Sequence, residues 1–154
     1  RRTWRAVGAR AAAAAALAAI LAAAGACAPA GAKYPEVRAV DGTVSLEAAD
    51  VAAGSVRFFT FRDDAGRAAD FFIYRDSGGT VRAAFDACRT CARWKKGYRL
   101  EGGKMVCIKC GMRFELDTLP TGIGSCVPVA VPVERTGGRL VIAAKALEEG
   151  ERYF

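Results

Sequence analysis

The stretch from Val56 to Phe85 decides the fold, and it reads VRFFTFRDDAGRAADFFIYRDSGGTVRAAF. Three segments rich in aromatic or β-branched residues, at 56–61, 70–74 and 81–85, alternate with two short segments of Asp, Ser and Gly. The apolar segments favour strands, and the Asp/Gly segments favour hairpin turns. The stretch therefore predicts a meander of short antiparallel strands.

Weaker strand patterns continue after the meander. Residues 104–107, 112–116 and 140–143 are predicted strands, and residues 127–133 hold Pro128 and Pro132, which suit an edge strand or an extended loop. The sequence thus predicts a mostly β fold, a small antiparallel sandwich over residues 55–144, with a charged tail over residues 145–154.

Two cysteine pairs stand among the predicted strands. Cys88-Arg89-Thr90-Cys91 is followed fifteen residues later by Cys107-Ile108-Lys109-Cys110-Gly111. A gap of two residues lets both sulfurs of a pair face one metal centre, and two such turns supply four thiolates. We predict one metal site formed by Cys88, Cys91, Cys107 and Cys110. Cys126, in a Gly-rich segment, is expected near this site as a further ligand or a redox-active thiol.

The spacing by itself is typical of a structural zinc ribbon. Disulfides within each pair would instead make a thiol–disulfide redox protein. If Cys27 carries a lipid, five cysteines remain, and an odd number cannot all pair within the chain, which favours a metal site. Met105 and Met112 adjoin the predicted ligands and would suit Cu(I), although their alternation within strands predicts core positions.

The surroundings of the pairs resemble the cluster-binding half of Rieske ferredoxins. The resemblance rests on residues 85–88, 96–107 and 110–118. In those proteins two loops between β-hairpins each offer one Cys and one His, and Cys91 and Cys110 stand roughly where the histidines would be. The resemblance implies a Rieske-like architecture in which two cysteine loops form one metal site. All-sulfur ligation should lower the reduction potential relative to a two-His centre.

A closer resemblance, over roughly residues 55–143, is to the FtrD-like family of membrane-associated iron–sulfur proteins. It rests on the order of the five cysteines, on Lys95-Lys96-Gly97-Tyr98 between the pairs, and on Gly124-Ser125-Cys126-Val127-Pro128 after them. Members typically sit in the bacterial envelope, often fused to a membrane region or beside ferrous-iron uptake permeases. The resemblance implies an iron–sulfur cluster, with 2Fe–2S favoured over zinc or copper, in an iron-transport or electron-transfer setting.

Positive charge surrounds the first cysteine pair. Between Cys88 and Leu100 there is no acid, but there are five cations: Arg89, Arg93, Lys95, Lys96 and Arg99. Nearby cations would stabilise a thiolate site whose net charge is about −2 and would raise its reduction potential. They could also dock an acidic electron partner or anionic lipid head groups.

Residues 1–26 have the composition of an export signal, with four arginines, no acid and an alanine-rich apolar run. Arg1-Arg2 resembles the start of a twin-arginine signal. Ala24-Gly25-Ala26-Cys27 resembles a bacterial lipobox, in which Cys27 would be lipidated. We expect an exported protein held at the membrane of the cell envelope by this lipid, facing the periplasm or the outside. Residues 27–54 would form a tether and an N-terminal arm.

Composition excludes several functions. The chain carries 23 Lys and Arg against 16 Asp and Glu, but without the four arginines of residues 1–26 the balance is 19 against 16, so nucleic acid is a poor partner. Histidine is absent, which rules out His-based hydrolases and the two-His Rieske centre. No residue is predicted to be catalytic. We predict an iron–sulfur electron-transfer protein that serves an envelope redox partner or an iron-permease system. A zinc module, a copper or iron carrier and a thiol–disulfide protein are the alternatives.

Overall fold

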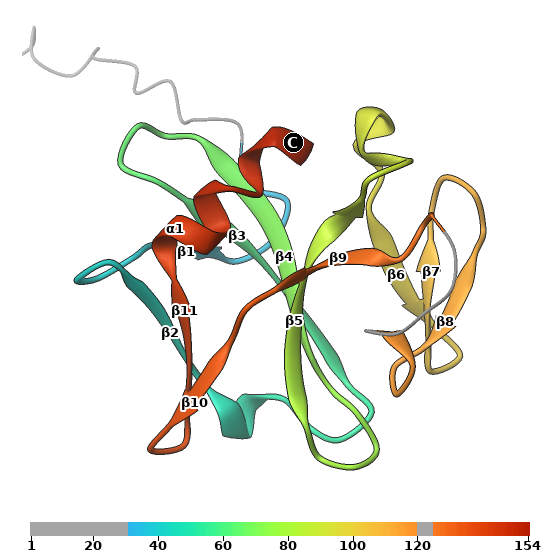
Figure 1. Ribbon diagram of the computed structural model, residues 1–154, viewed down its shortest axis with the longest axis horizontal. Coiled ribbons are helices and arrows are strands. Elements are labelled where there is room, and N and C mark those ends of the chain that lie inside the picture. The colour runs from blue at the N-terminus through green and yellow to red at the C-terminus, as the bar shows by residue number, and fades with distance from the viewer. Residues whose placement is uncertain (1–30, 120–124) are drawn as a thin grey trace, which may run out of the picture. The chain divides into compact units, whose positions relative to one another are not determined.

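The computed structural model describes residues 31–119 and 125–154, so the predicted export signal and Cys27 lie outside the described residues. The elements named below belong to a compact unit over Ala32–Phe154. Strands dominate this unit, which confirms the predicted mostly β fold (Figure 1). In chain order the elements are β1 (Glu36–Val37), β2 (Thr43–Glu47), η1 (Ala48–Asp50), β3 (Val56–Arg62), β4 (Ala68–Arg75), β5 (Val81–Cys88), η2 (Ala92–Trp94), β6 (Tyr98–Glu101), β7 (Lys104–Cys107), β8 (Arg113–Glu115), β9 (Pro128–Val131), β10 (Glu134–Thr136), β11 (Arg139–Ala143), α1 (Ala144–Glu148) and η4 (Glu151–Tyr153).

The central sheet has the strand order β1-β3-β4-β5-β9. Strands β3, β4 and β5 form the predicted antiparallel meander, in which Phe71 lies opposite both Phe59 and Phe85. Gly66 and Gly79, both with a φ of 82°, close the two hairpins because the turns need a left-handed residue there. Strand β9 begins at Pro128 and lies at the edge of the sheet. An edge strand tolerates proline because one side of the strand has no neighbour to which an N–H would donate.

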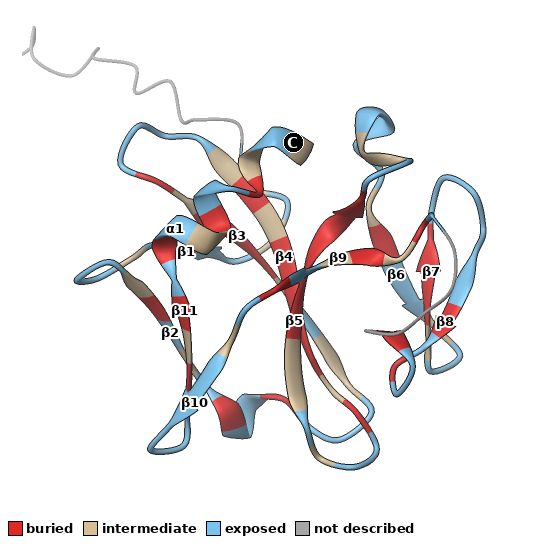
Figure 2. Cartoon of the chain, in the orientation of Figure 1, coloured by how far each residue is buried: buried red, intermediate tan, exposed pale blue. Residues whose placement is uncertain are grey.

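Both faces of the central sheet are buried, which explains the unbroken apolar run in β4. Phe71 and Ile73 point into one hydrophobic core, whereas Phe72 and Tyr74 point into a second core on the opposite face. Side chains of a strand alternate between faces, so a strand covered on both sides shows no polar alternation. Figure 2 shows the buried residues running along β4 and β5.

The first core lies between the central sheet and a second sheet of order β10-β11-β2. Here the structure differs from the expected boundaries at both ends. The predicted arm contributes β2, whose Val44 is buried and lies opposite Ile142 of β11. The predicted tail forms α1, whose Leu147 is fully buried, and ends with Phe154 packed on the same core. Burial of these few apolar side chains outweighs the polar composition of both segments.

The second core lies under a third sheet of order β6-β7-β8. Met105 of β7 and Phe114 of β8 are buried there against Phe72 and Tyr74 of the central sheet. Four cysteines also belong to this core or pack on it, namely Cys88, Cys91, Cys107 and Cys126. Among residues 31–119 and 125–154, no helix is long and apolar enough to span a membrane.

Candidate metal centre

The first cysteine pair leaves the end of strand β5. Cys88 is the last residue of β5 and is buried, and Cys91 immediately precedes η2 and is half-buried. The pairing of β5 with β9 shifts register between Ala84 and Cys88, so the strand is irregular where it enters the loop. The main-chain N–H of Cys91 donates to the sulfur of Cys88 at 3.1 Å. This bond turns the chain back within the pair.

The second pair lies in the turn between β7 and β8. Cys107 ends β7, its N–H donates to the carbonyl of Met112 at 2.9 Å, and Gly111 donates to the carbonyl of Cys107 at 2.8 Å. Gly111 has a φ of 74°, a left-handed conformation that glycine adopts without strain and that this turn requires. Cys107 is buried, whereas Cys110 is exposed at the surface.

A third segment brings in Cys126 just before β9. The hydroxyl of Thr90, in the first cysteine loop, donates to the carbonyl of Ser125 at 3.0 Å. The hydroxyl of Tyr98, at the start of β6, donates to the carbonyl of Cys126 at 2.5 Å. These two hydrogen bonds hold the third segment against the first loop and the hairpin.

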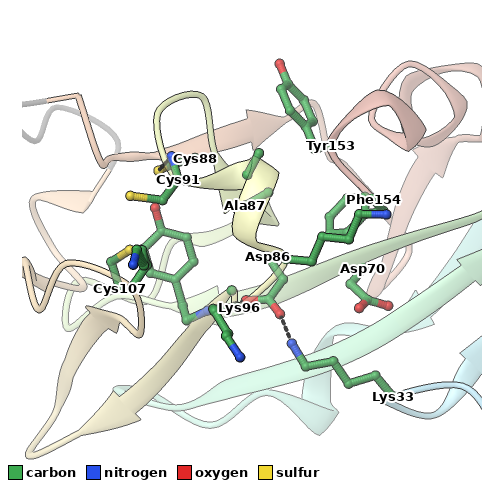
Figure 3. A pocket seen from close by; sticks show the side chains of 15 residues that line it. Lys33, Asp70, Asp86, Ala87, Cys88, Cys91, Lys96, Cys107, Tyr153 and Phe154 are labelled. Atoms are coloured by element: carbon green, nitrogen blue, oxygen red, sulfur yellow. Dashed lines mark hydrogen bonds and ion pairs between the residues drawn. The ribbon is translucent and has the colours of Figure 1, made fainter.

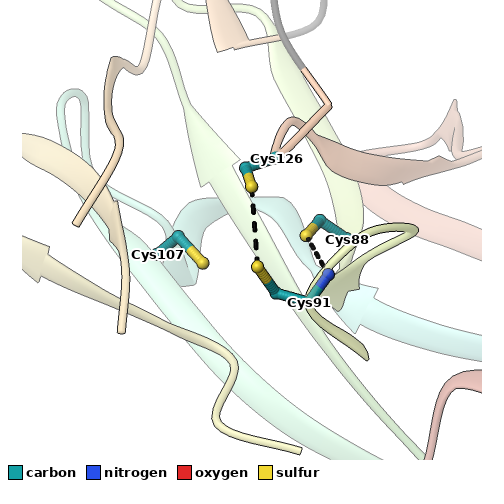
Figure 4. Close-up of side chains that lie close together, drawn as sticks. All are labelled: Cys88, Cys91, Cys107 and Cys126. Atoms are coloured by element: carbon teal, nitrogen blue, oxygen red, sulfur yellow. Dashed lines mark hydrogen bonds between the residues drawn. The ribbon is translucent and has the colours of Figure 1, made fainter. Parts of the chain in front are cut away.

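The five cysteines converge in one group, and all five are free thiols. The sulfurs of Cys88, Cys91, Cys107 and Cys126 all lie within 4.8 Å of one another (Figure 4). The Cys126 sulfur lies 3.6 Å from that of Cys91 and 3.2 Å from that of Cys110. The structure thus brings together three of the four thiols predicted from the spacing, with Cys126 among them, and it places Cys110 at the outer rim.

Burial and mutual proximity shift the acidity of these thiols in different directions. Burial raises the pKa of Cys91 and of Cys107, and it raises the pKa of Cys126 to about 11. The N–H of Met112 stabilises the thiolate of Cys110 and lowers its pKa. In the metal-free protein Cys110 is therefore the thiol that ionises most readily of these four.

A buried carboxylate lies directly behind the first pair. Asp86, two residues before Cys88, has a fully buried side chain that accepts three hydrogen bonds. Figure 3 shows the one from Lys33. The donors are the Tyr98 N–H at 2.6 Å, the Lys33 ammonium at 2.7 Å and the Tyr34 hydroxyl at 2.9 Å. Sequence reasoning missed this role, although an acid inside the apolar run of β5 is a recognisable signal for a paired buried charge.

The Asp86 contacts shift the acidity of each partner. Burial raises the pKa of Asp86 above its usual range, against the opposing effect of Lys33. Burial by itself would lower the pKa of Lys33, but the bonds with Asp86 and Tyr34 outweigh it and raise this pKa. Burial also raises the pKa of Tyr34 to about 12. Asp86 thereby ties the N-terminal arm to the β6 strand at the base of the cysteine site.

Gly97 is required by its close approach to Asp86. It has a φ of 70°, and a Cβ at this position would lie 2.2 Å from the Oδ2 atom of Asp86. Its carbonyl accepts a hydrogen bond from the N–H of Ile108 at 3.0 Å, which joins the segment after the first cysteine loop to the second loop. The glycine within the Lys-Lys-Gly-Tyr segment is therefore explained by packing as well as by backbone conformation.

A cavity of about 160 Å³ adjoins the thiols. Cys88, Cys91 and Cys107 contribute to one part of its wall, and Lys95, Lys96 and Lys109 contribute to another. Of the predicted basic loop, Lys95 and Lys96 line this cavity, whereas the charge of Arg99 is paired with Glu101 at 2.7 Å. Cations beside thiolates offset the repulsion among them.

Large side chains near the cysteines differ in their burial. Met105 is fully buried as predicted, whereas Met112 is 44% exposed and its predicted core position is wrong. The turn at Gly111 ends the strand alternation that the prediction assumed. Tyr98 is buried, while Trp94 lies half-exposed over the loop between two cations, Arg93 and Lys109.

The donor set fits a thiolate-bound metal or iron–sulfur centre. All five side chains that converge here are cysteines, and sulfur ligation is the coordination that iron–sulfur clusters use. Asp86 is the nearest carboxylate in sequence, but its oxygens are already engaged by Lys33, Tyr34 and Tyr98. The chemistry open to this site is therefore sulfur chemistry.

Part of the chain is similar to solved structures of a Rieske monooxygenase. No curated protein matched the chain. Among solved structures, the quaternary ammonium Rieske monooxygenase CntA in complex with the inhibitor MMV12 has a TM-score of 0.42 and 18% identity, over 64% of this chain and 30% of that chain. The same enzyme in complex with L-carnitine has a TM-score of 0.34 and 18% identity, over 49% of this chain and 25% of that chain. The chain thus spans less than a third of the length of these enzymes.

The family comparison covers every segment that supplies a thiol to the site. The sequence model of the family described as membrane iron–sulfur containing protein FtrD-like matches residues 51–154, which include all five clustered cysteines, Asp86 and Tyr98. The chain belongs to the FtrD-like family of membrane iron–sulfur containing proteins.

Proposed function

We propose that this chain binds an iron–sulfur cluster through its cysteine thiolates and exchanges single electrons with a partner at the cell envelope. Family membership supports the iron–sulfur cofactor. The observation that carries the proposal is the convergence of five free thiols from three chain segments, four of them with sulfurs within 4.8 Å of one another. When bound, such a cluster supplies one-electron redox chemistry at a potential set by its ligands, its hydrogen bonds and its burial.

Cys88, Cys91, Cys107 and Cys126 are the ligands that the geometry favours. Their four sulfurs all lie within 4.8 Å of one another, and all four residues are buried or half-buried, which would keep water from metal–sulfur bonds. Cys110 is the fifth thiol, exposed and 3.2 Å from the Cys126 sulfur, so it can replace Cys126 without a large movement of the chain. The spacing of the two pairs favours Cys110 instead of Cys126 as the fourth ligand. The two ligand sets are distinguished by whether Cys110→Ser or Cys126→Ser loses the metal.

The surrounding residues hold the thiols in place and tune them. The Cys91 N–H donates to the Cys88 sulfur, and hydrogen bonds to a ligating sulfur raise the reduction potential. Lys95, Lys96 and Lys109 line the adjoining cavity and act in the same direction. The fold supplies this rigid support without the need for a substrate pocket, which suits an electron carrier better than an enzyme.

The cellular setting forms part of the same proposal. An export signal over residues 1–26 and a lipid on Cys27 would hold the protein at the membrane, where an iron-permease system or an envelope redox chain would use it. The composition of residues 1–27 and the membrane-associated family support this setting.

A specific distance favours a second candidate, a single tetrahedral zinc, copper or iron ion. Four thiolates about 2.3 Å from one ion lie about 3.8 Å from one another. The inner four sulfurs, all within 4.8 Å, are already near that arrangement, whereas a cluster with several irons needs them farther apart. The second candidate function is therefore a structural zinc module or a metal carrier without redox turnover.

Metal analysis of the full chain tests the proposal directly. The chain is purified without oxygen in mild detergent, and iron, zinc, copper and acid-labile sulfide are measured beside the visible spectrum. Iron with an equal amount of sulfide and a brown colour support the cluster, and two irons per chain identify the favoured 2Fe–2S type. A colourless protein with one zinc per chain contradicts it and leaves the second candidate.

Single Cys→Ser variants identify the ligands on the same preparation. We expect Cys107→Ser and Cys126→Ser to lose the metal and the visible absorption, whereas Cys110→Ser retains most of both. Cys27→Ser is the matched control, since Cys27 is the one cysteine that is not proposed as a ligand. Loss of metal in Cys110→Ser with retention in Cys126→Ser contradicts the assignment of Cys126 and returns the ligand set to the two C-x2-C pairs.

A further inference from the structure

One face of the compact unit combines the outermost thiol with unpaired positive charge and exposed apolar side chains. We call it the cysteine-loop face, and it comprises Arg89, residues 93–96 and residues 108–112. All of these residues are exposed at the surface. Cys110 lies within it, so this is where the site comes nearest to solvent.

The cations of this face have no acidic partners. In the part of the chain that the structure describes, no ion pair involves the five cations of the face: Arg89, Arg93, Lys95, Lys96 and Lys109. Most other described cations do pair, including the neighbouring Arg99, Lys104 and Arg113. Four thiolates around a dication would carry a charge of about −2, so the five cations leave a local excess of about +3.

Apolar side chains are exposed at the same place. Trp94 is 37% exposed, Ile108 is 40% exposed and Met112 is 44% exposed. These three are among only five large hydrophobic residues exposed within residues 31–119 and 125–154. An apolar centre with a charged rim is the usual composition of a protein–protein interface.

The face is built as a unit across two cysteine loops. The Trp94 ring of the first loop lies between the guanidinium of Arg93, at 3.9 Å from its centroid, and the ammonium of Lys109, at 4.7 Å. The hydrogen bond from the Ile108 N–H to the Gly97 carbonyl joins the same two segments. Lys95 adopts a φ of 50°, a left-handed conformation that is unfavourable for lysine. Such a surface is preorganised for a partner.

We propose that the cysteine-loop face docks an acidic electron-transfer protein, whose carboxylates meet the five cations and whose apolar redox edge meets Trp94, Ile108 and Met112. This proposal rests on the proposed function, because the face gives a partner its closest approach to the thiols. An anionic bilayer is the weaker match. Insertion into lipid needs protruding apolar side chains, whereas these three are less than half exposed and Trp94 is covered by two cations.

Carbodiimide cross-linking tests the docking surface, because the reagent joins a carboxylate to an amine only where the two groups are in contact. The reagent adds to a carboxylate of the partner to form an O-acylisourea. A lysine amine then attacks the activated carbonyl carbon to form an amide, and a urea leaves. The probe is a purified acidic flavodoxin. The chain has six lysines, of which Lys95, Lys96 and Lys109 belong to the face, and Lys33, Lys104 and Lys145 do not.

We expect mass spectrometry to find the cross-links on Lys95, Lys96 and Lys109, and we expect them to disappear at about 1 M salt, where the Debye length is about 3 Å. The double variant Lys95→Glu/Lys96→Glu should reduce the remaining Lys109 cross-link by about tenfold. Lys145→Glu changes an exposed lysine of α1 that forms no ion pair among the described residues. It is the matched control and should change the yield of the Lys109 cross-link less than twofold.

Two outcomes contradict the proposal. In one, Lys145 is cross-linked as often as the lysines of the face. In the other, phosphatidylcholine vesicles containing one third phosphatidylglycerol bind the chain in a manner that Lys95→Glu/Lys96→Glu abolishes, while the flavodoxin gives no cross-link. The cross-links do not require electron transfer, so they are read independently of the metal analysis. A zinc-containing protein that cross-links at the face would overturn the electron carrier and retain the docking surface.

Discussion

Tyr98 links the cysteine hairpin to the third cysteine segment, since its hydroxyl donates to the carbonyl of Cys126 at 2.5 Å. Its main-chain N–H donates to Asp86 at 2.6 Å, two residues before Cys88. One buried residue therefore holds two of the three segments that supply thiols, and it belongs to the strand β6 that pairs with the third. The site depends on this support because its thiols come from three separate segments of the chain.

Replacing Tyr98 by Phe removes the hydroxyl and keeps the buried ring. We expect the variant to fold, to lose about 1 kcal/mol in the free energy of unfolding, and to release its metal faster than the original protein. Urea unfolding and the rate of metal transfer to a chelator measure the two effects. Tyr74→Phe is the matched control, because Tyr74 is equally buried and no hydrogen bond of its hydroxyl is found in the described residues. Equal metal release from both variants would contradict the role of the Tyr98 hydroxyl.

The Asp86 carboxylate predicts a difference between two substitutions. Asp86→Ala leaves the Tyr98 N–H and the Tyr34 hydroxyl without an acceptor, and we expect it to cost about 3 kcal/mol of stability. Asp86→Asn keeps an acceptor oxygen and should cost clearly less. Urea unfolding of the two variants, with Lys33→Met as a third, measures these losses of stability. If the alanine and asparagine variants unfold at the same urea concentration, the hydrogen bonds to Asp86 do not carry the stability.

Gly97 should tolerate no side chain. Gly97→Ala places a Cβ 2.2 Å from Asp86 in addition to the strain of a φ of 70°, so the Asp86 contacts must break. We expect a loss of more than about 3 kcal/mol, together with weaker metal retention. Gly102→Ala is the matched control, because Gly102 has a φ of 58° and open space around it. This control should cost only about 1 kcal/mol of backbone strain. Similar losses in the two variants would show that backbone conformation alone explains Gly97.

Thiol acidity predicts an order of alkylation in the metal-free protein. The pKa of Cys110 is lowered and that of Cys126 is raised to about 11, so iodoacetamide should modify Cys110 first. The thiolate is the reactive form, so the rate at Cys110 should rise in a lower pH range than for an ordinary thiol and then level off. The rate at Cys126 should keep rising towards pH 11. Peptide mass spectrometry after short exposures measures both rates.

The metal-loaded protein provides the control for that experiment. Ligation protects Cys88, Cys91, Cys107 and Cys126 from the reagent, whereas Cys110 should remain reactive if it is the fifth thiol. Protection of Cys110 together with modification of Cys126 would contradict the ligand assignment proposed above.

The sequence by itself determined the mostly β class, the hairpins of the meander and the family, and it limited residues 127–133 to an edge strand or an extended loop. Each depends on local information: aromatic and β-branched runs favour strands, Asp/Gly segments close turns, and proline removes one donor. The cysteine order was equally visible. The strand β2 within the N-terminal arm and the C-terminal helix α1 were not, because they are stabilised by burial of Val44 and Leu147 against distant strands.

Only the tertiary structure decided how the thiols are arranged. Spacing treats Cys107 and Cys110 as equivalent, but the turn at Gly111 buries the first and exposes the second. Cys126 reaches the inner group through the Tyr98 and Thr90 hydrogen bonds, which join residues far apart in sequence. The buried charge of Asp86 is likewise compensated by Lys33, which lies more than fifty residues earlier in the chain. Such relationships arise from long-range packing and hydrogen bonding, which a local pattern of residues does not encode.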